Sequence, residues 1–84
     1  MSWFTYMVRC ADGTIYTGIS KNVERRVRAH NGEIAGGAKY TRSRRPVELI
    51  YKTAWSSQGE ALRWEDALRY LTHKQKLRLA VGSK

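Results

Sequence analysis

The chain has 84 residues, of which 42% are hydrophobic and 11% aromatic, with a single proline. This composition excludes a disordered tail and predicts one small folded domain over residues 1–84. Sixteen lysines and arginines against seven acidic residues give a net charge of +9, which favours a polyanionic partner, most often nucleic acid, over an anionic membrane surface.

The first part of the chain predicts a β-hairpin. Apolar and polar side chains alternate over residues 3–10, and a second short apolar run follows over residues 14–19. Alternation of this kind indicates strands that are buried on one face. The Asp12-Gly13 pair between the runs is typical of a tight turn.

The length of the hairpin loop decides where its two tyrosines point. A two-residue loop would place Tyr6 and Tyr16 on opposite faces of the sheet. A three-residue loop, with Gly13 in the left-handed region, pairs Tyr6 with Gly18 and brings both phenols to one face as diagonal neighbours. We favour this register. On the hairpin alone, the alternative that both are ordinary strand tyrosines stays open.

The rest of the chain predicts three helices and one strand. Residues with capping side chains mark the helix starts, and two of them form the Ser/Thr-x-x-Glu/Gln capping box. The expected elements are a helix over about 22–31, a loop over 32–45, a strand over 46–55, a helix from Ser57 through residue 71 and a short helix over 73–81. This ββαβαα order predicts an α+β fold, with helices covering a small antiparallel sheet.

Three charged or titratable residues fall on or near the apolar faces of these helices. Arg26 and His30 lie along the edge of the core-facing stripe of the first helix, and Glu65 projects near the apolar side of the second. An inward carboxylate requires a partner or a metal, and an inward arginine requires an anion. Two interpretations stay open: a structural ion pair between Glu65 and Arg26, or a cleft that processes phosphate.

Nearly the whole chain resembles the GIY-YIG nuclease superfamily, especially its small stand-alone bacterial members and the catalytic domain of its structure-selective endonucleases. The similarity rests on the order and spacing of four segments. Before Tyr6, Phe4-Thr5 replaces the Gly-Ile of the first motif, which leaves the reactive tyrosine in place. The four segments are TYMVRCADGTIYTGIS, NVERRVRAHNG, GGAKYTRSRRPVELIY and SSQGEALRWEDALR.

The resemblance implies a three-stranded antiparallel sheet with flanking helices and one active site. It implies metal-dependent hydrolysis of DNA phosphodiester bonds, with Mg²⁺ or Mn²⁺ as the cofactor. In this scheme Tyr6 is the base, its pKa lowered by nearby cations, and Arg26 neutralises the phosphate. The implied catalytic residues are Tyr6, Tyr16, Arg26, His30 and Glu65, with Gly18 as a motif residue and Glu65 as the metal ligand.

The basic segment KYTRSRR is expected to follow a nucleic-acid backbone, although a solvated loop is the alternative. Its tyrosine is expected either to stack on an unpaired base, which would favour single-stranded or branched DNA, or to anchor the core. The residues expected to bind nucleic acid are Lys39, Tyr40, Arg42, Arg44 and Arg45.

Two rival functions remain at this point. One is a non-catalytic nucleic-acid-binding module that keeps the fold, and the other is a basic accessory protein of a ribosome or repair complex. Because no targeting domain is evident in the sequence, the choice of target is expected to depend on this domain or on a protein partner. The single cysteine, Cys10, and the lack of an apolar span predict a reduced, cytoplasmic setting without membrane contact.

Overall fold

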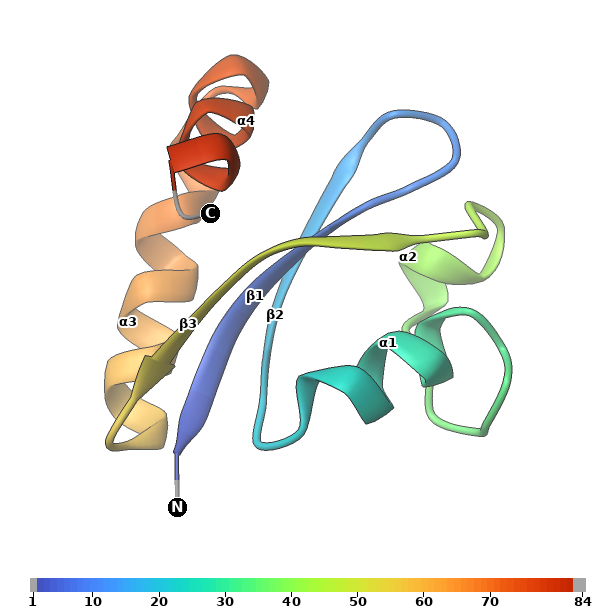
Figure 1. Cartoon of the computed structure of the whole chain (residues 1–84), viewed down its shortest axis with the longest axis horizontal. Helices are drawn as coiled ribbons and strands as arrows, with labels where there is room; N and C mark the ends of the chain where they lie inside the picture. The colour runs from blue at the N-terminus through green and yellow to red at the C-terminus, as the bar shows by residue number, and fades with distance from the viewer. Residues whose placement is uncertain (1, 83–84) are drawn as a thin grey trace.

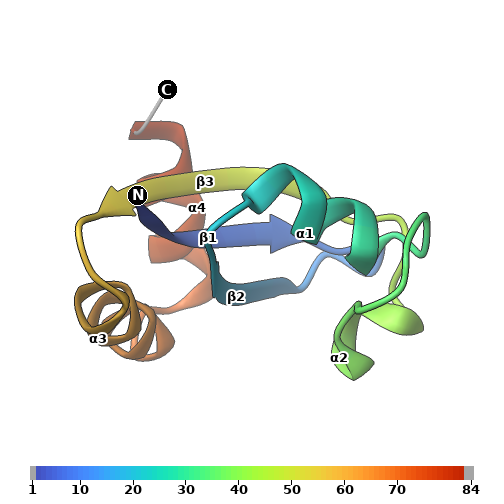
Figure 2. The same cartoon turned by 90° about the horizontal axis from the view of Figure 1, so that it is seen from below.

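The computed structural model describes residues 2–82, which form a three-stranded antiparallel sheet with helices on both faces (Figures 1 and 2). The strands are β1 (Trp3–Arg9), β2 (Ile15–Ser20) and β3 (Glu48–Trp55), in the order β2-β1-β3. The helices are α1 (Val23–His30), α2 (Lys39–Arg42), α3 (Gln58–Arg69) and α4 (His73–Gly82). The predicted α+β class and antiparallel sheet are confirmed.

The hairpin has the predicted three-residue loop. Tyr6 pairs with Gly18 and Val8 with Tyr16 in the β1–β2 register. Gly13 closes the loop with a φ of +87°, a conformation that costs glycine little because it has no Cβ. Both tyrosines therefore lie on one face of the sheet.

The central strand β1 divides the interior into two cores. Tyr6 and Val8 pack with Val23 of α1 on one face. Met7 packs with Leu68 of α3 on the other face, where α4 also contributes. Figure 1 shows the strands overlapping in projection, with α1 on one side of the sheet and α3 on the other. The two tyrosines consequently face α1, whereas α3 lies behind them.

The predicted helix caps are present. The Asn22 side chain accepts a hydrogen bond from the Arg25 N–H at 3.1 Å. Ser57 accepts from the Glu60 N–H, and its hydroxyl donates to the Glu60 carboxylate. The third cap, at α4, is reciprocal: the Thr72 N–H donates to the Gln75 side chain and the Gln75 N–H donates to the Thr72 hydroxyl.

The segment predicted as a loop over 32–45 contains the short helix α2. Its N-cap residue, Ala38, offers no side-chain hydrogen bond, so the sequence carries no start signal. The chain before it presses against α1: a Cβ added to Gly37 would lie 2.4 Å from the Ala29 carbonyl oxygen. This close approach, possible because Gly37 lacks a side chain, brings α2 to the C-terminal end of α1.

Within residues 2–82, the helices are all too short and too polar to cross a lipid bilayer.

Candidate active site

The Tyr6 phenol lies across the neighbouring strand and meets an imidazole. Its hydroxyl oxygen is 2.7 Å from Nε2 of His30, and both side chains are at most 1% exposed. The ring crosses β2 at Gly18, where an added Cβ would lie 2.6 Å from the Tyr6 hydroxyl oxygen. Gly18 therefore provides the space that lets the phenol reach α1, as the register predicts.

Hydrogen bonds to the other ring nitrogen fix the protonation of His30. The backbone N–H of Ala38 donates to Nδ1 at 3.3 Å, and the Thr41 hydroxyl lies 3.0 Å from the same atom. A backbone N–H can only donate, so Nδ1 carries a lone pair and the ring proton of neutral His30 resides on Nε2. In this tautomer, Nε2–H donates to the oxygen of Tyr6.

Burial shifts the proton affinities of this pair in opposite directions. It lowers the pKa of His30 to about 4, with the Arg26 and Arg45 charges acting in the same sense. It raises the pKa of Tyr6 to about 12, although the nearby Arg26 guanidinium acts against this shift. The lowering expected from nearby cations is thus present, but burial outweighs it because the phenol is enclosed by the sheet and α1.

The structure brings the other three predicted catalytic residues to the same pair. The Tyr16 ring meets His30 edge-on at 5.2 Å between centroids. Arg26 donates to the Gly36 carbonyl, which directs its guanidinium toward the loop before α2. The charges of Arg26 and Glu65 both act on the Tyr6 hydroxyl. The five residues therefore form one cluster.

Glu65 does not form the alternative structural ion pair with Arg26. The ion pairs within residues 2–82 involve other carboxylates, and the Glu65 carboxylate has no hydrogen-bond partner in that range. The same residues contain no group of three or more His, Cys, Asp or Glu side chains able to hold an ion by themselves. A lone half-buried carboxylate fits a magnesium-type ion, which usually keeps several waters and binds one or two carboxylates plus a substrate phosphate.

A cavity of about 230 Å³ lies where Glu65 meets the sheet. Its walls include Tyr16 and Thr17, which alternate between the two faces of β2. Because β2 is an edge strand, the cavity lies at the free edge of the sheet. It connects the tyrosine face with the α3 face. Its lining residues are Ile15, Tyr16, Thr17, Tyr40, Glu65, Arg69 and Lys76.

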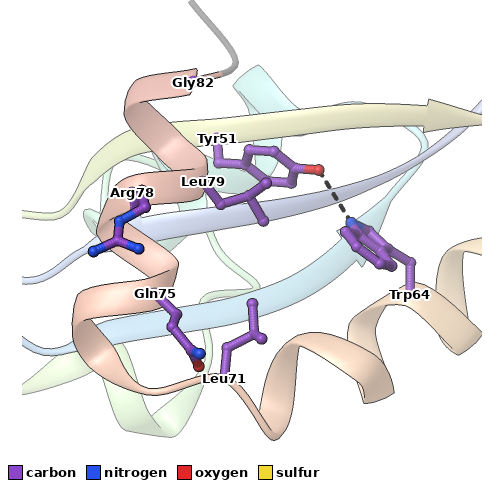
Figure 3. Close-up of a pocket in the computed structure, with 7 residues that line it drawn as sticks. All are labelled: Tyr51, Trp64, Leu71, Gln75, Arg78, Leu79 and Gly82. Atoms are coloured by element: carbon purple, nitrogen blue, oxygen red, sulfur yellow. Dashed lines mark hydrogen bonds between the residues drawn. The ribbon is translucent and has the colours of Figure 1, made fainter.

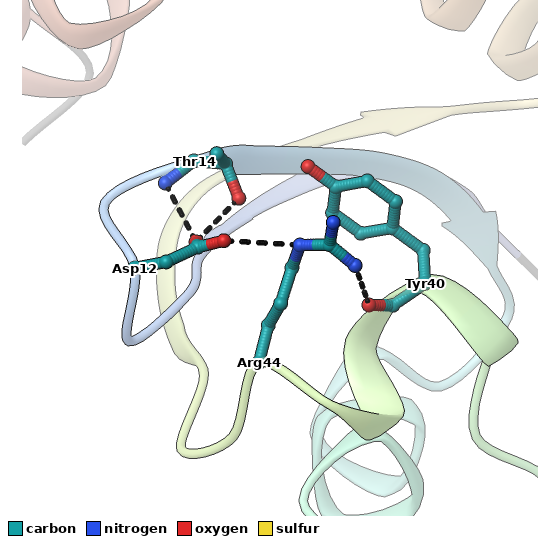
Figure 4. Close-up of polar contacts among 4 residues, drawn as sticks. All are labelled: Asp12, Thr14, Tyr40 and Arg44. Carbon is teal, nitrogen blue, oxygen red and sulfur yellow. Dashed lines mark hydrogen bonds and ion pairs between the residues drawn. The ribbon is translucent and has the colours of Figure 1, made fainter.

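Tyr40 covers one side of this cavity and is held there by Arg44 (Figure 4). The Tyr40 ring stacks on Tyr16 at 5.7 Å, and the Arg44 guanidinium lies 3.9 Å from the Tyr40 ring centroid. Arg44 also pairs with Asp12 at 3.0 Å and donates to the Tyr40 carbonyl. Both uses expected of Tyr40, anchoring and base stacking, are compatible with its place, since 37% of it is exposed.

The remaining cations of the basic segment have different surroundings. Lys39 and Arg42 are exposed on α2. Arg45 donates from Nε to the His30 carbonyl at 2.7 Å and so satisfies a backbone acceptor at the end of α1. Arg42 and Arg45 share an open cavity of about 540 Å³ with the glycine-rich loop before α2. This face of the molecule is basic and lies beside the cluster.

A third hollow shares no lining residue with the cavity at Glu65. Figure 3 shows it between α4 and β3, with Leu71 and Leu79 on its wall and a hydrogen bond from Trp64 Nε1 to the Tyr51 hydroxyl. Its volume is about 570 Å³. Because its lining is mainly apolar, this hollow does not suit phosphate chemistry.

Sequence reasoning missed three neighbours of the cluster. Thr41, fully buried, contacts the imidazole of His30. Arg69 and Lys76 line the cavity with Glu65. Arg69 was detectable in principle, because it follows Glu65 by four residues and so shares its helix face. Thr41 and Lys76 had no such signal, since each lies on a separate element whose packing the sequence does not reveal.

Comparisons with known proteins identify the family of this chain. The model of the GIY-YIG catalytic domain family matches residues 2–78. A UPF0213 protein of Desulfotalea psychrophila is 48% identical over 82 residues, covering 98% of this chain and 74% of the relative. A UPF0213 protein of Staphylococcus aureus is 46% identical over 78 residues and is covered to 93%, as is this chain.

Two solved structures have the same fold. The solution NMR structure of a UPF0213 protein from Bacillus halodurans is 39% identical, with a TM-score of 0.59 over 96% of this chain and 84% of that one. The solution NMR structure of a protein from E. faecalis is 40% identical, with a TM-score of 0.62 over 93% of this chain and 81% of that one. With a family match that covers residues 2–78, the chain belongs to the GIY-YIG catalytic domain family.

Proposed function

We propose that this protein is a metal-dependent endonuclease that hydrolyses DNA phosphodiester bonds, with single-stranded or branched DNA as the preferred form. The observation that carries the proposal is the contact of 2.7 Å between the Tyr6 oxygen and Nε2 of His30, within reach of the charges of Arg26 and Glu65. A buried phenol needs a hydrogen-bond partner in any role, so the feature that favours catalysis is that the charges of Arg26 and Glu65 act on the same hydroxyl.

Glu65 is the residue that would hold the divalent ion. Its carboxylate is free of protein partners within residues 2–82 and faces a cavity wide enough to admit water. When bound there, Mg²⁺ or Mn²⁺ supplies positive charge that stabilises the leaving 3′-oxygen and lowers the pKa of neighbouring acids.

Tyr6 acts as the general base toward the attacking water. Its phenolate form is stabilised by the hydrogen bond from Nε2–H of His30 and by the charge of Arg26. The pKa of about 12 keeps the phenol protonated at neutral pH in the free protein. Tyr6 would therefore be protonated in the free protein and would act as a base only when further positive charge lies near its hydroxyl.

Arg26 and Tyr16 act at the scissile phosphate. The guanidinium of Arg26 neutralises the scissile phosphate, for which its planar fork of donors is suited. The Tyr16 hydroxyl orients the water or the phosphate from the cavity wall. Tyr40, exposed beside it, favours unpaired bases, and a base that stacks there competes with the Arg44 guanidinium for the ring.

The tyrosine roles are tested by cleavage of labelled single-stranded, duplex and branched DNA in Mg²⁺ or Mn²⁺. Both Tyr6→Phe and Tyr16→Phe are expected to lower the cleavage rate, and Tyr6→Phe, which removes the proposed base, should lower it about 100-fold or more. The affinity of both variants for DNA should stay near that of the wild type. Tyr51→Phe, which removes a hydroxyl on the other face of the sheet, is the matched control. Wild-type cleavage rates in both site variants would contradict the scheme.

A further inference from the structure

The cavity at Glu65 contains two cations that the catalytic scheme does not use. Arg69 lies one turn after Glu65 on α3, and Lys76 reaches the same cavity from α4. Neither side chain forms an ion pair with Glu65 within residues 2–82. Cations that served only to neutralise a half-buried carboxylate would be expected to pair with it.

Within residues 2–82, these two cations have few interactions with acidic side chains. Arg69 has a surface contact of 3.5 Å with Asp66, in which both side chains are more than half exposed. Lys76 has no side-chain hydrogen bond or ion pair in residues 2–82, although it is half-buried. A half-buried ammonium without a partner is available to an anion that enters the cavity.

A third polar group in the cavity is also unpartnered. The Thr17 hydroxyl oxygen is buried and has no hydrogen-bond partner. Thr17 belongs to the edge strand and lines the cavity with Glu65 and Lys76. Buried hydroxyls are usually satisfied, so this one would gain the partner it lacks if its side chain turned toward an anion in the cavity. This observation is independent of the charges.

We propose that Lys76, Arg69 and Thr17 form a second phosphate subsite, which binds the backbone phosphate next to the scissile one. The proposal rests on the proposed endonuclease function and adds α4 to the DNA interface. The DNA strand would then pass from the basic segment on α2, over Tyr40 and Tyr16, to Lys76, which reaches the cavity from α4. Helices α2 and α4 are far apart in sequence, but Tyr40 of α2 and Lys76 of α4 line the same cavity.

The test is the salt dependence of DNA binding, measured by fluorescence anisotropy on a labelled single-stranded oligonucleotide, with a chelator present to prevent cleavage. The slope of log K against log salt is negative, and the loss of one phosphate contact makes it shallower by about 0.7. We expect this shallower slope for Lys76→Ala, with weaker binding at low salt, and recovery of the slope in Lys76→Arg. Lys74→Ala is the matched control, because it removes an equal charge from an exposed position on α4 that does not line the cavity.

Equal slopes for Lys76→Ala, Lys74→Ala and the wild type would overturn the subsite, even if the wild type cleaves DNA. A shallower slope in Lys76→Ala alone would support the subsite, even if the wild type fails to cleave, in which case the endonuclease proposal would fall separately. Thermal unfolding of the variants by circular dichroism verifies that α4 remains folded. A second variant, Arg69→Ala, is expected to make the slope shallower in the same way.

Discussion

The Tyr6 hydroxyl is placed between influences that act on its proton in opposite directions. Burial raises its pKa to about 12, whereas Arg26 and the Nε2–H of His30 favour the phenolate. The sequence indicated the cations but not the depth of burial, because depth depends on how α1 packs on β1. At the scale of single residues, the base that we propose is therefore held in its protonated form until further positive charge lies near it.

Gly18 is the residue whose replacement tests the path of the phenol. Because an added Cβ would lie 2.6 Å from the Tyr6 hydroxyl oxygen, we expect Gly18→Ala to displace the ring and cost about 1–3 kcal/mol of stability. DNA cleavage should fall with it. Gly59→Ala is the control, since its nearest neighbour is an Arg63 side-chain atom at 4.0 Å, and it should be neutral or stabilising. Urea unfolding of both variants measures the difference; equal stabilities would argue against the ring position described here.

His30 makes stability depend on pH. Its folded pKa of about 4 lies below the unfolded value of 6.5, so the unfolded chain binds the proton first. The contribution is complete above about pH 6.5 and is lost as pH falls toward 4. At about 1.4 kcal/mol per pKa unit, the loss amounts to a few kcal/mol. His30→Gln should lack this loss in urea unfolding at a series of pH values, and a constant stability difference between the two proteins from pH 7 to 4 would refute it.

At the scale of elements, α2 and the β1–β2 hairpin are tied together by one arginine. Arg44 pairs with Asp12 in the hairpin loop, and the Asp12 carboxylate also accepts from the N–H and hydroxyl of Thr14. These contacts, drawn in Figure 4, hold α2 and its Tyr40 ring against Tyr16. Arg44 is thus a structural cation as well as an expected DNA contact.

Because Arg44 is paired with Asp12, we expect Arg44 and Lys39 to contribute differently to DNA binding. Lys39→Ala should make the salt slope shallower by about 0.7–0.9, because Lys39 is exposed and has no ion pair in residues 2–82. Arg44→Ala should change it less, since Asp12 already neutralises part of its charge. Anisotropy titrations over a range of salt concentrations provide both slopes. A larger change for Arg44→Ala than for Lys39→Ala would show that the Asp12 pair opens on binding.

The sequence predicted those elements whose start or turn is marked by a local sequence signal. The hairpin register was predictable because Gly13 selects the loop length locally. Helices α3 and α4 were predictable because Ser57 and Thr72 each begin the sequence signature of a capping box. Helix α2 was not, because it begins without a side-chain cap and is stabilised by the approach of Gly37 to α1. Likewise, Arg26, His30 and Glu65 were found from helical spacing, whereas Thr41 enters the site only through the packing of α2.

At the scale of the whole molecule, the charge and the fold combine at the free edge of β2. The net charge of +9 supplies the attraction for a polyanion, and the edge strand lets Glu65, behind the sheet, share a cavity with Tyr16 in front of it. Family membership accounts for the fold and the nuclease chemistry expected of it. The single carboxylate of Glu65 near the tyrosines suits the one-metal site that we propose rather than a site with two metals.

The most direct test of the central claim is DNA cleavage by the wild type and by Glu65→Gln, each assayed in Mg²⁺, in Mn²⁺ and with a chelator. The account predicts that cleavage needs the divalent ion and is lost in Glu65→Gln, while that variant binds the same DNA with unchanged affinity under chelation. Asp66→Asn, which neutralises the adjacent exposed carboxylate, should cleave as the wild type does. Undiminished cleavage by Glu65→Gln, or cleavage in the chelator, would contradict the account.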